Sequence, residues 1–169
     1  MMSGDAPSGW LDGATHLLMV RVYYEDTDLS GMVYHANYLR WFERARSDLL
    51  RLVGIDQRAA HEAGEGAFAV ADMSLRYVSP ARLDDVVRVE TRLDTLTRAS
   101  CTLLQQAFRR ETLLCAARVR VAFVAPGGRP RRFSPAWHQA LDALKPALKI
   151  PPQDSTLSFP ETDFEKARS

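Results

Sequence analysis

The chain has 169 residues, a length that suits a single domain. Hydrophobic residues make up 46% of the chain, which is enough to form a core and excludes a wholly disordered protein. The formal net charge of +1 gives no indication of bulk binding to nucleic acid or to an anionic membrane surface.

Several segment types are missing from the sequence. No apolar run approaches the ~20 residues of a membrane-spanning helix, so membrane insertion is not expected. The first fourteen residues lack the basic and continuous apolar regions of a signal peptide. These features predict a cytoplasmic protein. Cys101 and Cys115 lie in apolar, strand-like surroundings, which predicts buried thiols, and no ligand spacing indicates a metal site.

The N-terminal part predicts a leader followed by a strand. Residues 1–14 are rich in Gly, Ser, Ala, Asp and Pro, and we expect a flexible leader. Residues 15–145 are the predicted domain, and the proline-containing remainder, 146–169, is a predicted loose tail. Alternation of apolar and polar residues predicts a first strand from His16 to Tyr24, with His16 as an ordinary surface histidine.

A long amphipathic helix is predicted between Val33 and Val53, because no proline or glycine interrupts these residues. On its polar face, Arg44 and Asp48 are spaced i,i+4, which is typical of a solvated surface. Gly54 stands where a helix C-cap is expected. The apolar stripe of this helix consists of Tyr38, Phe42, Ala45, Leu49 and Leu52.

The rest of the domain predicts four more strands and a short helix. The strands are Ala67–Val78, Val86–Leu96, Ser100–Arg109 and Leu113–Val124, and the helix is Pro135–Leu144, capped by Ser134. We therefore predict an α+β fold, in which a five-stranded antiparallel sheet surrounds one long helix. Because one helix cannot cover both faces of five strands, we also expect self-association.

The loop before the long helix carries the candidate chemistry. Asp26, Asp28 and Ser30 precede His35, which is expected at the start of the helix. A helix N-terminus has unpaired N–H groups and attracts an anion or a developing oxyanion, and a nearby carboxylate can face the same point. This pattern predicts a hydrolytic site, although acidic loops before helices also serve simply as turns and caps.

Two sequence segments resemble a known family. Residues 25–46, EDTDLSGMVYHANYLRWFERAR, resemble the signature of the 4-hydroxybenzoyl-CoA thioesterase family, in particular its YbgC-like branch. A second match, YVSPARLDDV, follows at residues 77–86, and the similarity covers about residues 15–140. The resemblance implies a hotdog fold and hydrolysis of an acyl-CoA thioester to a free acid and coenzyme A. It also implies that coenzyme A is part of the substrate, that no separate cofactor is needed, and that the site lies at the interface of a homodimer or homotetramer.

The resemblance also assigns roles to individual residues. Asp28 falls on the position of the catalytic aspartate, which acts either as general base on water or as a direct nucleophile. The backbone N–H of His35 matches the group that polarises the thioester carbonyl, and its side chain matches a histidine of the YbgC-like branch. Tyr24 and Tyr34 are candidates for the acyl pocket, and Glu43 is a rival acid that we expect to form an ion pair.

Arginines are expected to bind the coenzyme A phosphates. Arg98 matches a basic region that the family uses for the nucleotide end, and Arg129, Arg131 and Arg132, which follow the last strand, are candidates for the same role. We expect Arg82 to pair with Asp84 or Asp85. Two other functions stay open: a dehydratase or hydratase of the same fold, and a non-catalytic module that binds acyl thioesters or acyl carrier protein. The motifs leave open whether the acyl group is short and aliphatic or aromatic.

Overall fold

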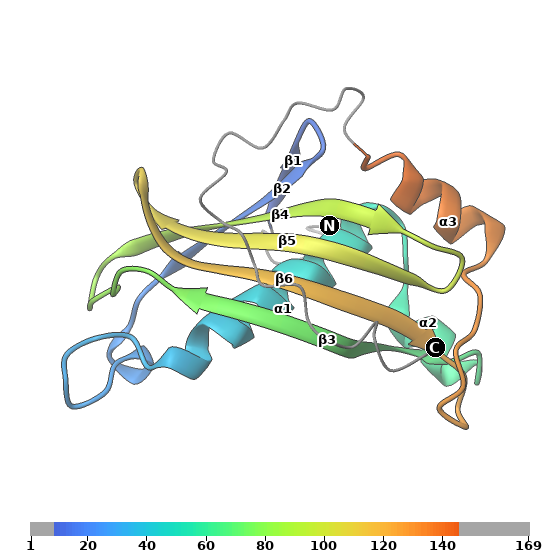
Figure 1. The fold of residues 1–169 in the computed structure, drawn as a ribbon, viewed down its shortest axis with the longest axis horizontal. Helices are drawn as coiled ribbons and strands as arrows, with labels where there is room; N and C mark the ends of the chain where they lie inside the picture. The colour runs from blue at the N-terminus through green and yellow to red at the C-terminus, as the bar shows by residue number, and fades with distance from the viewer. Residues whose placement is uncertain (1–8, 146–169) are drawn as a thin grey trace, which may run out of the picture.

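A computed structural model describes residues 9–145 of the chain, so residues 1–8 and the predicted tail, 146–169, lie outside the described part. The predicted α+β fold is confirmed: an antiparallel sheet crosses the molecule and one long helix packs against one of its faces (Figure 1). Among the described helices, none is long and apolar enough to cross a membrane.

The sheet contains six strands rather than the expected five. They are β1 (Trp10–Asp12), β2 (Thr15–Arg21), β3 (Ala67–Tyr77), β4 (Val86–Leu96), β5 (Ser100–Arg109) and β6 (Thr112–Val124). Their spatial order is β1-β2-β4-β5-β6-β3, and every neighbouring pair is antiparallel. The edges of the sheet are therefore the very short β1 and the eleven-residue β3 (Figure 1).

The sixth strand arises within the segment predicted as a flexible leader. Trp10 to Asp12 pair with β2 through a hairpin, in which Trp10 lies opposite Leu17 and Asp12 opposite Thr15. Gly13 makes the tight turn possible because its φ is +58°, a region that glycine enters without steric cost. The leader prediction was wrong for these residues, because composition alone does not reveal a three-residue strand.

The first predicted strand ends earlier than expected, at Arg21. Tyr24 to Asp26 form a single 3-10 turn, η1, instead of extending the strand. Two hydrogen bonds explain the change of direction: the Val22 N–H donates to the Asp85 carbonyl at 2.9 Å, and the Tyr23 N–H donates to the Asp26 carboxylate at 2.8 Å. Tyr24 consequently lies outside the sheet.

The long helix, α1 (His35–Leu52), supplies the centre of the core. The predicted stripe is buried from Tyr38 to Leu49, and Trp41 joins it with only 1% exposure, whereas Leu52 is exposed. The helix ends as predicted at Gly54, whose φ is +80°. Paired N–H bonds from Gly54 and Ile55 back to the last turn form a Schellman motif.

The predictions for His16 and Asp48 were wrong, because the two side chains form a buried pair. His16 is 0% exposed and Asp48 is 6% exposed. The His16 Nε2 lies 2.8 Å from Asp48 Oδ2, and the Gly9 N–H donates to the same oxygen at 2.8 Å. Asp48 therefore connects α1 to β2 and to the chain that precedes β1, and the i,i+4 spacing to Arg44 was misleading.

Two short helices complete the described part. α2 (Gln57–Glu62) follows the Schellman motif, and α3 (Pro135–Asp142) follows β6. As predicted, the Ser134 hydroxyl caps α3 by accepting from the Trp137 N–H at 3.2 Å. α3 covers the end of the sheet at which β4 and β6 terminate (Figure 1), and Leu141 is buried there in the core.

Candidate active site

Asp28 lies at the start of a tight turn between β2 and α1. Its carbonyl accepts from the Gly31 N–H at 2.9 Å, and its own N–H donates to the Met32 carbonyl at 3.0 Å. Its carboxylate accepts hydrogen bonds from the Ser30 N–H, at 2.8 Å, and from the Ser30 hydroxyl. Both bonds favour the ionised form, so they lower the pKa of Asp28, with a smaller electrostatic contribution from His35. Asp28 is therefore an exposed carboxylate that stays ionised at neutral pH.

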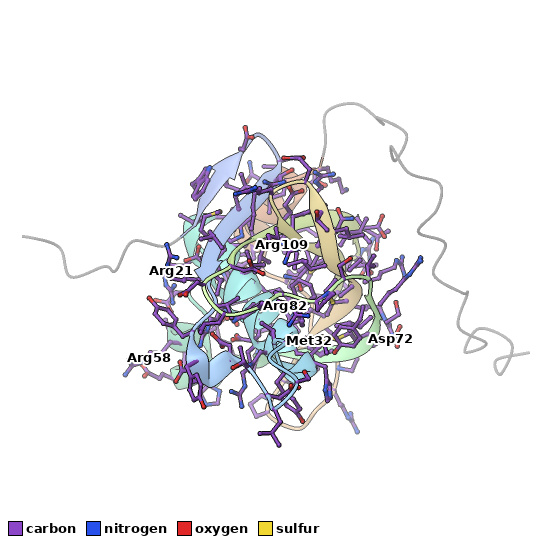
Figure 2. All side chains as sticks on the ribbon, turned by 90° about the vertical axis from the view of Figure 1, so that its left-hand side faces the viewer. Arg21, Met32, Arg58, Asp72, Arg82 and Arg109 are labelled. Carbon is purple, nitrogen blue, oxygen red and sulfur yellow. The ribbon has the colours of Figure 1, made fainter. Side chains whose placement is uncertain are left out.

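The two sequence motifs lie side by side at this end of the molecule. Met32 pairs with Arg82 in an isolated bridge, and the Val33 N–H donates to the Ala81 carbonyl at 2.9 Å. The Tyr38 hydroxyl, in turn, accepts from the Ala81 N–H at 3.2 Å. Figure 2 looks onto this end, where Met32 and Arg82 both lie near the centre of the view. The segment before β4 thus fixes the Asp28 turn against the helix.

The ion pair expected for Arg82 is formed by a different arginine. The Arg109 guanidinium binds the Asp85 carboxylate at 2.9 Å, while Arg82 contributes its backbone N–H to the same carboxylate, also at 2.9 Å. These contacts lower the pKa of Asp85 even though partial burial opposes the shift. The sequence prediction failed because Arg109 lies 24 positions away and reaches Asp85 only through the pairing of β4 with β5.

The start of α1 presents free backbone donors. The Asp26 carbonyl accepts from the Tyr34 N–H at 2.8 Å and from the Asn37 side chain at 2.9 Å, which fixes the direction of the first turn. Within residues 9–145, the N–H groups of His35 and Ala36 have no hydrogen-bond acceptor. Unpaired N–H groups at a helix N-terminus are suited to binding a carbonyl oxygen or an oxyanion.

Aromatic side chains surround these donors. The His35 ring lies 4.4 Å from the Tyr34 ring and 6.2 Å from the Tyr77 ring, measured between centroids. The Tyr77 hydroxyl also donates to the His35 carbonyl at 2.9 Å. Tyr34 thus lies beside the start of α1, whereas Tyr24 is 83% exposed and contacts none of these rings. The sequence prediction did not include Tyr77, although it is the first residue of the second motif.

The two predicted arginines lie at the opposite end of the sheet. Arg98 follows β4, whose start is next to the Asp28 turn, and an eleven-residue strand spans roughly 35 Å. Arg131 donates to the Glu65 carbonyl, just before β3, whereas Asp28 and His35 lie near the end of β3. A single chain therefore does not bring either arginine to Asp28.

Arg98 lines an open cavity of ≈ 510 Å³ together with Arg132 rather than Arg131. The same cavity includes His138 of α3, so three basic side chains face one space, with Asp142 as the acid among them. Phe133 and Pro135 provide the apolar part of the lining. Arg132 was among the candidate arginines that follow the last strand, whereas His138 was not predicted, because only the packing of α3 brings it to the β4–β5 turn.

A smaller cavity of ≈ 130 Å³ lies between α1 and the sheet. Its lining is mostly apolar and includes Phe68 and Val70 of the edge strand β3, with Glu43 and Arg46 from α1. Glu43 accepts a hydrogen bond from the Ser47 hydroxyl at 2.6 Å, and no ion pair of Glu43 is found in the described part, so the predicted pairing is replaced by a hydroxyl contact. The α1 residues that line this cavity begin at Glu43, about eight positions after His35.

Comparisons with known proteins identify the family of this chain. Residues 22–153 match the family model described as the thioesterase-like superfamily. The acyl-CoA thioesterase YbgC of Haemophilus influenzae is 40% identical over 124 residues, which cover 70% of this chain and 91% of that protein. The acyl-CoA thioester hydrolase YbgC of Escherichia coli O6:H1 is 44% identical over 108 residues, which cover 63% of this chain and 80% of that protein.

Solved structures confirm the predicted hotdog fold. A probable thioesterase from Bartonella henselae aligns with a TM-score of 0.67 at 36% identity, covering 71% of this chain and 99% of that one. A 4-hydroxybenzoyl-CoA thioesterase variant in complex with 4-hydroxybenzoyl-CoA aligns with a TM-score of 0.69 at 20% identity, covering 76% and 99%, and this likeness shows the fold alone. Given the match to the family model over most of its length and these relatives, the chain belongs to the thioesterase-like superfamily.

Proposed function

We infer that this protein is an acyl-CoA thioesterase of the YbgC type, and we propose that Asp28 and the start of α1 form its catalytic centre. The relatives that share most of its length carry this activity in their names. The observation that carries the residue assignment is the placement of an ionised Asp28 on the turn that leads directly into the unpaired N–H groups of His35 and Ala36.

In the proposed reaction, the N–H of His35 binds the thioester carbonyl oxygen and stabilises the negative charge that develops on it. Asp28 either removes a proton from the attacking water or attacks the carbonyl carbon itself, in which case water opens the resulting anhydride. In both routes the carbon–sulfur bond breaks when the tetrahedral intermediate collapses, which in the second route precedes the opening of the anhydride by water. The leaving thiolate takes up a proton, and the products are the free acid and the coenzyme A thiol. Hydrogen bonds from Ser30 lower the pKa of Asp28, so the carboxylate is ionised at neutral pH, which is the form that either role requires.

We propose that the working form is a homodimer joined through β3. This strand pairs only with β6, so one of its edges is unpaired within the described chain, and Val70 on it is 50% exposed. An antiparallel pairing of two copies along this edge places the start of β3 in one copy beside the end of β3 in the other. Arg98 and Arg131 of one copy are thereby brought toward Asp28 of the other copy.

In this proposed dimer, each of the two cavities binds a different part of the substrate. The ≈ 130 Å³ cavity opens beside Phe68 and Val70, so its acyl-sized apolar space lies near the second copy's Asp28 turn. The larger cavity beside Arg98 and Arg132 lies farther out on the same side and suits the phosphates of coenzyme A. Substrate binding is thus proposed to use one catalytic turn and the cavities of the other copy.

The decisive experiment measures release of free thiol from a panel of aliphatic and aromatic acyl-CoAs. The Asp28→Asn variant is expected to lose at least 100-fold in kcat, on the order of what a general base contributes, while Asp12→Asn, an exposed acid on β1, serves as the control. Equal rates for Asp28→Asn and the wild type remove Asp28 from the mechanism. Tight binding of thioesters without turnover supports a binding module, and consumption of an enoyl-CoA supports a hydratase.

A complementation experiment tests the dimer separately. Asp28→Asn copies and Arg98→Ala copies are mixed after mild denaturation and refolded together. If one site uses Asp28 from one copy and Arg98 from the other, the hybrid contains one intact site, and low-KM activity appears that neither parent shows. A mixture whose activity equals the mean of the two parents contradicts the shared site, and light scattering reports whether dimers form at all.

A further inference from the structure

Tyr77 connects the edge strand β3 to the first turn of α1. Its hydroxyl donates to the His35 carbonyl at 2.9 Å, and its ring packs edge-on against the rings of His35 and Tyr38, at 6.2 and 5.8 Å between centroids. The Tyr77 side chain is about half exposed, so it lies at the open surface of the candidate site. The hydrogen bond is made by the Tyr77 side chain and is separate from the β3–β6 ladder, in which Tyr77 pairs with Cys115.

The carbonyl that accepts this bond belongs to the same peptide group as the Ala36 N–H. A hydrogen bond to the oxygen of an amide draws electron density from its nitrogen and makes its N–H a stronger donor, which is the source of cooperativity in hydrogen-bonded chains. Within residues 9–145 the Ala36 N–H has no acceptor, and Ala36 is the second residue of the helix. The Ala36 N–H therefore lies beside the His35 N–H, points in the same direction and is likewise free to donate a hydrogen bond.

We propose that the Ala36 N–H is a second donor to the substrate carbonyl, and that Tyr77 is a positioning residue that orients and polarises it through the His35–Ala36 peptide. This inference rests on the proposed function of the helix start. The thioester oxygen is bound by two adjacent N–H groups, of which one is strengthened by a side chain from the sheet. Burial raises the pKa of Tyr77, so its hydroxyl keeps its proton and remains a donor at neutral and moderately alkaline pH.

The expected effect follows from two magnitudes. Loss of one direct oxyanion donor reduces kcat by about 10²- to 10³-fold, and a cooperative neighbour strengthens a hydrogen bond by about 10–30%. If the bond from Tyr77 supplies about 10–30% of the free energy that the Ala36 donor contributes, Tyr77→Phe lowers kcat by roughly two- to eight-fold. KM is expected to stay within about two-fold, because the phenyl ring keeps the packing and only the transition state develops full charge on the oxygen.

The experiment uses a graded series at position 77 of the full-length protein. Phenylalanine, tyrosine and 3-fluorotyrosine are compared, since fluorine makes the phenol a stronger donor while it changes the shape little. The expected order of kcat is phenylalanine, then tyrosine, then 3-fluorotyrosine. Tyr23→Phe is the matched control, because its ring is 61% exposed and contacts none of the rings at the site. A flat series overturns the proposal, because a packing role does not depend on donor strength.

A spectroscopic readout does not depend on turnover. An acyl-CoA with a ¹³C-labelled thioester carbonyl is bound to Asp28→Asn and to the Asp28→Asn, Tyr77→Phe double variant. Polarisation by Tyr77 predicts that the carbonyl stretch lies at lower frequency in the single variant, and identical frequencies overturn the inference. If Asp28→Asn retains wild-type activity, the catalytic centre proposed for Asp28 and the start of α1 fails. If Asp28→Asn is inactive but Tyr77→Phe matches the wild type in kcat and in the spectrum, only the role of Tyr77 fails.

Discussion

The buried pair of His16 and Asp48 offers a quantitative test of how the central helix is held. We consider the substitution Asp48→Ala, which removes the acceptor of two hydrogen bonds, one from the His16 ring and one from the Gly9 N–H, both at 2.8 Å. Each donor is then left without this acceptor in an environment where Asp48 itself was only 6% exposed. A buried donor that loses its partner costs about 1–3 kcal/mol, so two such donors together cost about 2–6 kcal/mol.

We therefore expect Asp48→Ala to lower the free energy of unfolding by about 2–6 kcal/mol. For a chain of this size, each 1 kcal/mol corresponds to about 2–4 °C, so Tm should fall by roughly 4–24 °C. Urea unfolding followed by circular dichroism measures the free energy directly. The control is Glu62→Ala, which breaks the ion pair with Arg58 at 2.7 Å between exposed side chains and should cost about 0.3–0.5 kcal/mol.

A loss below about 1 kcal/mol for Asp48→Ala would refute the reasoning, because it would mean that the donors find other partners at no cost. The double replacement of His16 and Asp48 by apolar residues of similar size provides a second check. Since the His16 ring is then removed together with its acceptor, fewer buried polar groups are left unpaired, and the double variant should be more stable than Asp48→Ala. A double variant that is more stable than Asp48→Ala supports a buried pair, and a double variant that is less stable contradicts it.

Three further predictions concern smaller features. Hydrogen bonds from Ser30 lower the pKa of Asp28 below its ordinary 3.8, so activity should be lost only as pH falls through that lowered pKa. Ser30→Ala should therefore move the acid limb of the kcat/KM profile to higher pH. A limb that does not move means that another group titrates. Burial raises the pKa of the Cys115 thiol to about 12, so a thiol reagent should modify neither buried cysteine at pH 7 until urea unfolds the protein. A Cβ at Gly66, where φ is +145°, would lie 2.2 Å from a backbone oxygen of β6, so Gly66→Ala should cost about 1–3 kcal/mol, whereas Gly127→Ala should be nearly neutral in the same unfolding assay.

Local patterns were sufficient for most of the fold. Alternation predicted four strands close to their observed bounds, and the spacing of Tyr38, Phe42, Ala45 and Leu49 predicted the buried face of α1. These features depend on periodicity and on glycine and proline signals, which act over a few residues. The three-residue β1 carries too few residues to show a period, so it was missed.

Contacts between distant residues were not predictable in the same way. Asp48 was expected in solvent because its partner, His16, lies 32 positions away and only the packing of α1 on β2 brings them together. The pairing of Arg109 with Asp85 depends likewise on strand register. At the candidate site, the family signature placed Asp28 and His35 on one turn and one helix start, while the hydrogen bond from Tyr77 became apparent only in three dimensions.

The unequal edges of the sheet have a consequence for how large an assembly can become. One margin is closed by the three residues of β1, and the other offers the eleven residues of β3. If two copies pair along β3 about a twofold axis, both β3 margins are occupied. The β1 margins that remain are too short to recruit another chain. We therefore expect sheet extension through these edges to stop at two copies.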